Sequence, residues 1–158
     1  MKIITNFFIS LFYCGYIRII PPGTFASLIS LFIFVPVIQL NIISNNLFIG
    51  IFVIIFLLSI YFIKNFSSYT KSHDSKTIVI DEFLGVYLIF IFYDYIFIYN
   101  IYLTTVLIFI LFRFFDIKKI YPANIIDGKM NNALGVILDD LVAASYTIIV
   151  LYIFNVII

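Results

Sequence analysis

Residues 47–63 read LFIGIFVIIFLLSIYFI, a run without a single charged side chain. A helix crosses the hydrocarbon core of a bilayer with about 20 mostly apolar residues, within a range of about 17 to 25. The whole chain has the same character, because 65% of its 158 residues are hydrophobic and only 11% are charged. So few charges cannot cover the surface of a small soluble domain. The sequence therefore predicts an all-α integral membrane protein.

Apolar runs of similar length lie on both sides of this segment. The opening run, 3–20, is either a further span or an interfacial segment, because Gly15, Arg18 and the prolines interrupt its second half. We therefore predict a polytopic bundle of about five to six long helices that forms one membrane-embedded domain over 1–158. The spans expected besides 47–63 are 24–40, 83–99, 101–112 and 133–158.

The positions of lysine and arginine predict the orientation. Arg18 precedes the first long span, and the other cations fall mainly in the segments 64–76 and 113–129. With these spans, all three regions lie on one side, which the positive-inside rule makes cytoplasmic. The abundance of Ile, Phe, Tyr, Asn and Lys is typical of an AT-rich bacterial genome. We expect a multi-pass protein of the bacterial cytoplasmic membrane. A net charge of +1 provides no basic field for nucleic acid.

Most of the carboxylates gather at the same predicted face. Of eight acids, only Asp94 lies elsewhere, and solvated loop charge accounts for Asp74 and Asp127. Each of the others sits where an apolar helix begins or ends, so we expect a functional site there. These five acids are Asp81, Glu82, Asp116, Asp139 and Asp140.

Four of these five acids form two adjacent pairs, Asp81-Glu82 and Asp139-Asp140, and each pair is embedded in apolar sequence. Charges in such runs are costly, face the protein interior and pair with another group. Adjacent acids both stay ionised only when a cation lies close. Salt bridges to lysine or arginine would satisfy them, but a divalent-ion site is the better hypothesis. Mg²⁺ favours carboxylate oxygens and keeps waters that a substrate phosphate can replace.

Arg113 and Asp116 are three residues apart, so they share one face of a helix. They form either a local ion pair at the helix end or a functional pair. In the functional interpretation, Asp116 binds the metal and the Arg113 guanidinium binds a phosphate. Lys118 and Lys119 add positive charge for a phosphate or for anionic lipid.

Two further candidates come from weaker signals. Thr24 follows Pro21-Pro22-Gly23 and is placed to cap the next helix, whose first amides favour an anion. His73, beside Asp74, is a candidate general acid for a leaving alkoxide, although a lone loop histidine is more often incidental.

Four ordered blocks of residues resemble the phosphatidylglycerophosphatase A family over nearly the whole chain. In chain order they are Pro22, Gly23, Thr24, Ser27 and Leu28; Asp74, Ile78, Val79, Asp81, Glu82 and Gly85; Phe112, Arg113, Asp116, Lys119 and Pro122; and Gly135, Val136, Asp139, Asp140 and Ala143. The chain departs from the family pattern at glycines and prolines, for example at Ala26 and Ile120. Every charged family position that we can match is retained.

The resemblance implies Mg²⁺-dependent hydrolysis of phosphatidylglycerophosphate to phosphatidylglycerol and phosphate at the cytoplasmic face. The five acids would act as metal ligands and catalytic groups. Arg113, Lys119 and Thr24 would bind the substrate phosphate, with Asp74 and His73 as secondary candidates.

Two other classes compete with this interpretation. A CDP-alcohol phosphotransferase needs Ala-Arg where this chain has Asn131-Asn132, and a second Asp where it has Ala143. A small transporter or ion-pathway subunit would carry acids near the bilayer midplane. Here the middles of the expected spans carry no acidic residues, which favours the lipid phosphatase.

Overall fold

The protein is described by a computed structural model over residues 2–70 and 75–157. Every regular element within these ranges is helical, which confirms the all-α prediction. The elements are α1 (Lys2–Ile9), the 3₁₀ turn η1 (Cys14–Tyr16), α2 (Pro22–Gln39), α3 (Asn45–Thr70), α4 (Ile80–Ile91), α5 (Tyr93–Ile96), α6 (Ile101–Lys118), α7 (Ala123–Lys129) and α8 (Ala133–Ile157).

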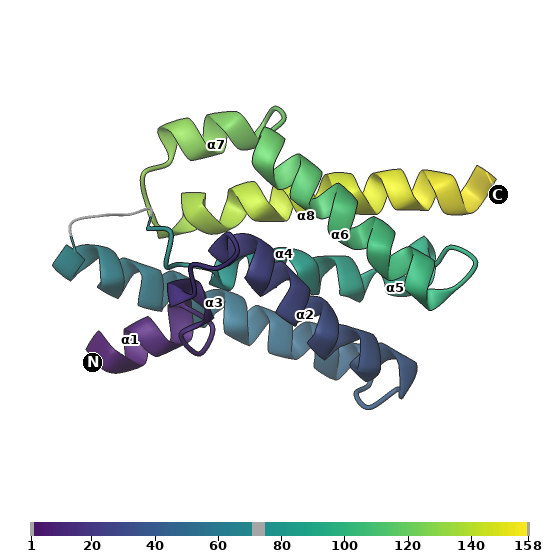
Figure 1. Ribbon diagram of the computed structural model, residues 1–158, viewed down its shortest axis with the longest axis horizontal. Coiled ribbons are helices and arrows are strands. Elements are labelled where there is room, and N and C mark those ends of the chain that lie inside the picture. The colour runs from purple at the N-terminus through teal and green to yellow at the C-terminus, as the bar shows by residue number, and fades with distance from the viewer. Residues whose placement is uncertain (1, 71–74, 158) are drawn as a thin grey trace.

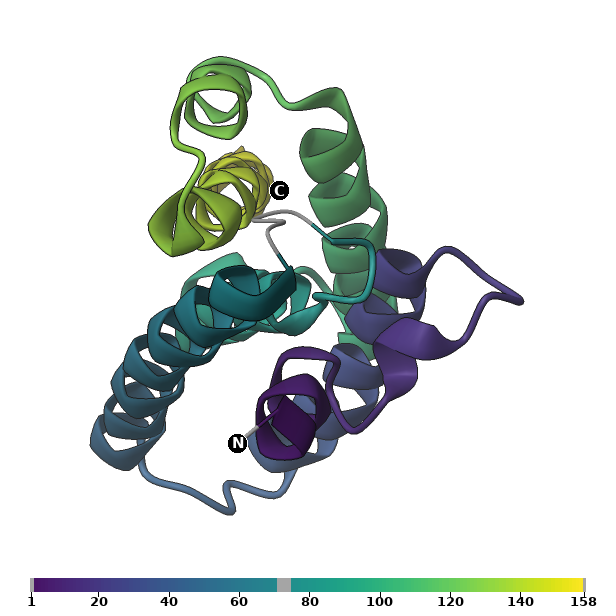
Figure 2. The ribbon, with the colours of Figure 1, turned by 90° about the vertical axis from the view of Figure 1, so that its left-hand side faces the viewer.

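Helix α4 lies at the centre of the bundle, where it packs against α2, α3, α6 and α8 (Figures 1 and 2). Its apolar side chains point in several directions and are nearly all buried, among them Leu84, Val86 and Ile89. A helix that is hydrophobic all round belongs inside a protein. The outer helices instead leave large apolar side chains uncovered, for example Phe32 of α2 and Leu57 of α3.

Three helices are long and apolar enough to cross a membrane, namely α2, α3 and α8. Their length and their exposed apolar faces indicate membrane association. The expected span over 83–99 is divided into α4 and α5. The chain turns at Phe92, which lets Tyr93 and Ile96 become buried, and Asn155 of α8 donates a hydrogen bond to the Tyr95 carbonyl at 2.9 Å. Tertiary packing thus interrupts a segment whose composition alone suggested one helix.

The opening run does not form a single helix. α1 has 8 residues, a length of about 12 Å, which is much shorter than a hydrocarbon core of about 30 Å. The chain leaves it through Leu11, Phe12 and Tyr13, which all have positive φ, and then forms η1. Two alternatives were open for residues 3–20, and the membrane-crossing helix is the one that does not fit this geometry.

Helix α6 extends beyond the expected boundary at 112 and carries charged residues in its last turns. The Asn100 side chain caps its first turn by accepting a hydrogen bond from the Leu103 amide at 2.8 Å. The helix ends where Lys119 adopts a left-handed conformation with φ 43°. Arg113 and Asp116 therefore remain on a regular helix, one turn apart.

One end of the bundle collects the charged segments. At the left of Figure 1 lie the beginnings of α2, α4 and α8, the ends of α3 and α6, and α7. The turn between α2 and α3, the helix α5 and the C-terminus lie at the other end. The segments that were expected to share one membrane side therefore share one end of the molecule.

Candidate active site

A cavity of about 970 Å³ opens at the charged end. Its walls come from the segment before α2 and the first turn of that helix, the segment before α4, and helices α4, α6, α7 and α8. The charged side chains that line it are Arg18, Lys76, Asp81, Glu82, Arg113, Asp116, Lys119, Asp127, Asp139 and Asp140. The fold thus brings all five acids predicted from the sequence, together with Arg113 and Lys119, around one space.

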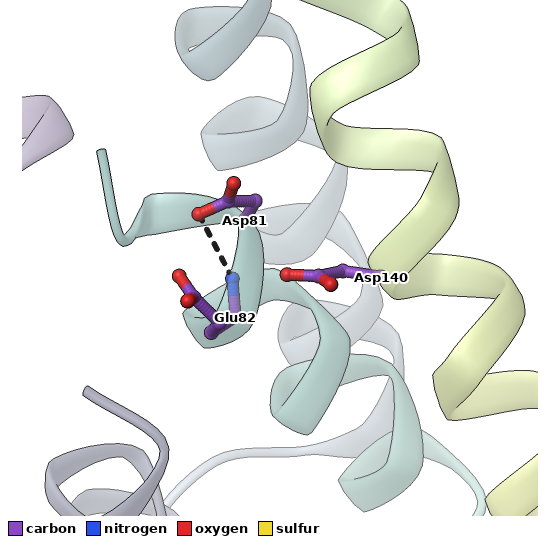
Figure 3. Close-up of side chains that lie close together, drawn as sticks. All are labelled: Asp81, Glu82 and Asp140. Atoms are coloured by element: carbon purple, nitrogen blue, oxygen red, sulfur yellow. Dashed lines mark hydrogen bonds between the residues drawn. The ribbon is translucent and has the colours of Figure 1, made fainter. Parts of the chain in front are cut away.

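Asp81, Glu82 and Asp140 form a compact carboxylate cluster in this cavity. One oxygen from each lies within 4.8 Å of the others. Figure 3 shows Asp81 and Glu82 in the first turn of α4, with Asp140 pointing towards them from α8. Asp81 Oδ1 also accepts a hydrogen bond from the Glu82 amide at 3.2 Å. Among the described residues, no lysine or arginine nitrogen lies within 4.0 Å of Asp81 or Asp140. Carboxylates this close together all stay ionised only when a cation lies near them.

Arg113 connects this cluster to Asp116. Its Nη1 donates to Asp116 Oδ2 and lies 4.0 Å from Glu82 Oε1. Within the described ranges, its Nε and Glu82 Oε2 are buried without a hydrogen-bond partner. The ion pair that was one of the two alternatives for Arg113 and Asp116 is present, and the guanidinium also has donor capacity left for a ligand.

Lys119 holds α7 and α8 together across the cavity. Its Nζ donates to Asp127 Oδ1 at 2.5 Å and to Asp139 Oδ2 at 2.9 Å. Burial lowers the pKa of Lys119, but the hydrogen bonds and charges of the two aspartates outweigh it, so the net pKa is raised above its ordinary value. Asp139 is thereby engaged by a cation, unlike its neighbour Asp140.

The structure does not support a site role for Thr24, and it does not describe His73 or Asp74. The predicted cap at Thr24 is wrong, because α2 begins at Pro22 and Pro21 occupies the cap position without a side-chain hydrogen bond. Proline suits the first helical position, since it has no amide hydrogen to leave unpaired. Thr24 therefore lies inside the first turn, and it is not among the residues that line the cavity. His73 and Asp74 lie outside the described residues.

Gly23 is a close neighbour of the carboxylate cluster, although it was not among the residues predicted to form the site. A Cβ at this position would lie 1.9 Å from Glu82 Oε1 and 3.2 Å from Arg113 Nη1. The first turn of α2 therefore packs directly against the Glu82 carboxylate. Only its place in the Pro-Gly-Thr block marked this residue in the sequence.

We expect Gly23→Ala to lower the catalytic rate about tenfold while leaving the fold intact, because the added methyl displaces the end of a flexible side chain rather than backbone. If the cluster holds Mg²⁺, as the family resemblance implies, the displaced carboxylate should also raise the Mg²⁺ concentration needed for half-maximal rate. Both are measured by a Mg²⁺ titration of phosphate release in detergent. Gly50→Ala is the matched control, because nothing lies within 4 Å of a Cβ there. Equal effects of the two substitutions would contradict this role for Gly23.

The protein is an apolar helical bundle with a polar cavity, and this cavity combines clustered carboxylates with arginine and lysine. These features define its class, a membrane-associated enzyme that acts on phosphate. Comparison with known proteins identifies the family. The chain belongs to the phosphatidylglycerophosphatase A family, whose family model matches residues 7–155. It is similar to the phosphatidylglycerophosphatase A of Haemophilus influenzae, with 33% identity over 136 residues, which cover 83% of this chain and 77% of that protein. No solved structure matches. The family resemblance inferred from the four sequence blocks is confirmed.

Proposed function

We propose that this protein hydrolyses phosphatidylglycerophosphate to phosphatidylglycerol and inorganic phosphate, with Mg²⁺ held in the cavity at the charged end. Membership of the family makes the chain a phosphatidylglycerophosphatase, an enzyme of phospholipid metabolism. The observation that carries the assignment of the site is the cluster of Asp81, Glu82 and Asp140 in the same cavity as Arg113.

The carboxylate cluster fits a hard divalent ion. Mg²⁺ is bound by carboxylate oxygens, often only one or two, with waters and substrate phosphate in the other positions. Asp81, Glu82 and Asp140 supply these oxygens, and Glu82 Oε2 is a buried acceptor without a partner among the described residues. When bound, Mg²⁺ would neutralise charge on the phosphate and act as a Lewis acid.

The charged residues around the cluster divide the remaining work. Arg113 binds oxygens of the monoester phosphate, which a guanidinium matches with two parallel N–H donors. Asp116 holds Arg113 by an ion pair along α6. Lys119 keeps Asp139 and Asp127 in place at the opposite wall. Hydrolysis adds water across the phosphorus–oxygen bond, so phosphatidylglycerol is released as the alcohol and the phosphoryl group as inorganic phosphate.

We also propose that the protein is multi-pass, with α2, α3 and α8 among its spans and the cavity at the cytoplasmic face. Two observations support this orientation. The end that contains the cavity carries the segments rich in lysine and arginine, as the positive-inside rule requires of a cytoplasmic side. The turn at the other end, residues 40–45, has neither residue type.

Phosphate release from phosphatidylglycerophosphate in nonionic detergent tests the activity. We expect release by the purified protein, a fall of at least about tenfold with EDTA, and recovery when Mg²⁺ is added back. Phosphate release at the same rate with and without EDTA would contradict the proposed metal site but not the proposed reaction. Ion flux in proteoliposomes without hydrolysis would instead support the transporter interpretation and overturn the proposed function.

A further inference from the structure

The cationic side chains of the cavity fall into two groups. Arg113 and Lys119 are engaged by carboxylates through ion pairs. Arg18 and Lys76 also line the cavity, yet no carboxylate oxygen of the described residues lies within 4.0 Å of either. In the first group Arg113 is assigned to the monoester phosphate and Lys119 to Asp127 and Asp139, so the second group is the one available for a different anion.

Arg18 and Lys76 lie on two chain segments that pack against each other. A Cβ at Gly15 would lie 2.3 Å from the Thr77 carbonyl oxygen, so the two backbones are in direct contact there. A hydrogen bond of 3.0 Å from the Val79 amide to the Ile9 carbonyl joins the same segments. Arg18 follows Gly15 by three residues, and Lys76 immediately precedes Thr77. This pair of segments forms one wall of the cavity, apart from the wall that Lys119 builds between α7 and α8.

The same wall has an apolar flank. Ile19 is 92% exposed and stands beside Arg18, and Ile20 and Ile17 are exposed as well. An exposed apolar stretch next to a cationic residue is suited to the membrane interface, where the apolar groups contact acyl chains and the cation meets the head group. A lipid entering from this flank would pass its glycerol backbone and the first phosphate along Arg18.

The proposed substrate carries two phosphates of different kinds. The terminal monoester is hydrolysed, whereas the diester nearer the acyl chains stays in the product. We propose that Arg18 and Lys76 bind this diester phosphate and make the enzyme prefer a lipid with two phosphates over one with a single terminal phosphate. This inference rests on the proposed function and extends it to substrate selection.

The test compares wild type with Arg18→Gln/Lys76→Gln on phosphatidylglycerophosphate and on phosphatidic acid of the same acyl composition, in nonionic micelles. Phosphatidic acid has only the monoester, and it serves as a substrate or, if turned over slowly, as a competitive inhibitor. We expect kcat/KM for phosphatidylglycerophosphate to fall about tenfold, as expected for lost charge-assisted hydrogen bonds at a partly solvated site. The loss should lie mainly in KM, because the residues contact a part of the lipid that does not react. For phosphatidic acid, the rate or inhibition constant should change less than about twofold.

Lys64→Gln/Lys129→Gln is the matched control, since both lysines are exposed and neither lines the cavity. It should leave both lipids unaffected, which excludes a general loss of surface charge. Suppose that wild type is active and that Arg18→Gln/Lys76→Gln either keeps the same preference between the two lipids or loses the same factor in kcat/KM on both. Either result would overturn this inference alone. A wild type that hydrolyses neither lipid would overturn the proposed function and this inference with it.

Discussion

Replacing Asp140 by asparagine is expected to reduce phosphate release at least about 1,000-fold, which is the largest effect that a single conservative substitution should have. Asp140 is buried in α8 and faces Asp81 and Glu82 across the cluster. Asparagine preserves the shape of the side chain but removes its charge, and with it one of the three carboxylates that would attract Mg²⁺. Asp81→Asn should have a similar effect.

The folded state should survive this change. Without metal, the three acids of the cluster repel one another, so neutralising one of them should leave the unfolding temperature of the metal-free protein unchanged or raise it. Mg²⁺ should then raise the unfolding temperature of wild type more than that of Asp140→Asn, because only a bound ligand stabilises the native state. Asp94→Asn, in α5 at the other end of the bundle, is the control and should keep full activity. Wild-type turnover by both cluster variants would refute the proposed site.

Arg113→Gln is expected to lower kcat/KM at least about 100-fold, because it removes the guanidinium that would bind the reacting phosphate. It also leaves Asp116 and Glu82 without their cation in a site where the arginine side chain is only 14% exposed. Part of the effect should therefore be a loss of stability, since breaking a buried pair leaves an uncompensated charge. Steady-state kinetics and thermal unfolding in detergent measure the two contributions.

Arg113→Lys distinguishes a phosphate ligand from a structural ion pair. Lysine keeps the positive charge near Asp116 but lacks the planar fork of donors. We expect this variant to recover most of the stability and only a small part of the activity. If Arg113→Lys is as active as wild type, the residue serves as an ion pair at the end of α6, and another group must bind the phosphate.

The fold was predictable from the sequence where one physical effect dominates. Long apolar runs at 24–40, 47–63 and 133–158 have no stable alternative to a helix in a membrane, because every backbone amide must be satisfied within the segment. Each corresponds to a long helix. The prediction was less accurate for 83–99, where packing of Tyr93 and Ile96 turns the chain. Hydropathy does not contain that information.

The composition of the site was also largely readable. Acids at the ends of apolar helices are too costly to be accidental, and all five selected on that ground line the cavity. Their roles in catalysis stay predictions. Gly23, Arg18 and Lys76 escaped notice as site residues, since a glycine or an exposed cation has no signature until its neighbours are known.

The sequence by itself determined that the protein associates with a membrane, that it is helical, which family it belongs to and which charged residues form the site. Each of these depends on composition or on spacing along the chain. Only the tertiary structure decided which of these charged residues contact one another. Asp81 and Glu82 meet Asp140, whereas Asp116 pairs with Arg113 and Asp139 with Lys119. The division depends on where α4, α6 and α8 cross one another, and residues about 60 positions apart become neighbours only through that packing.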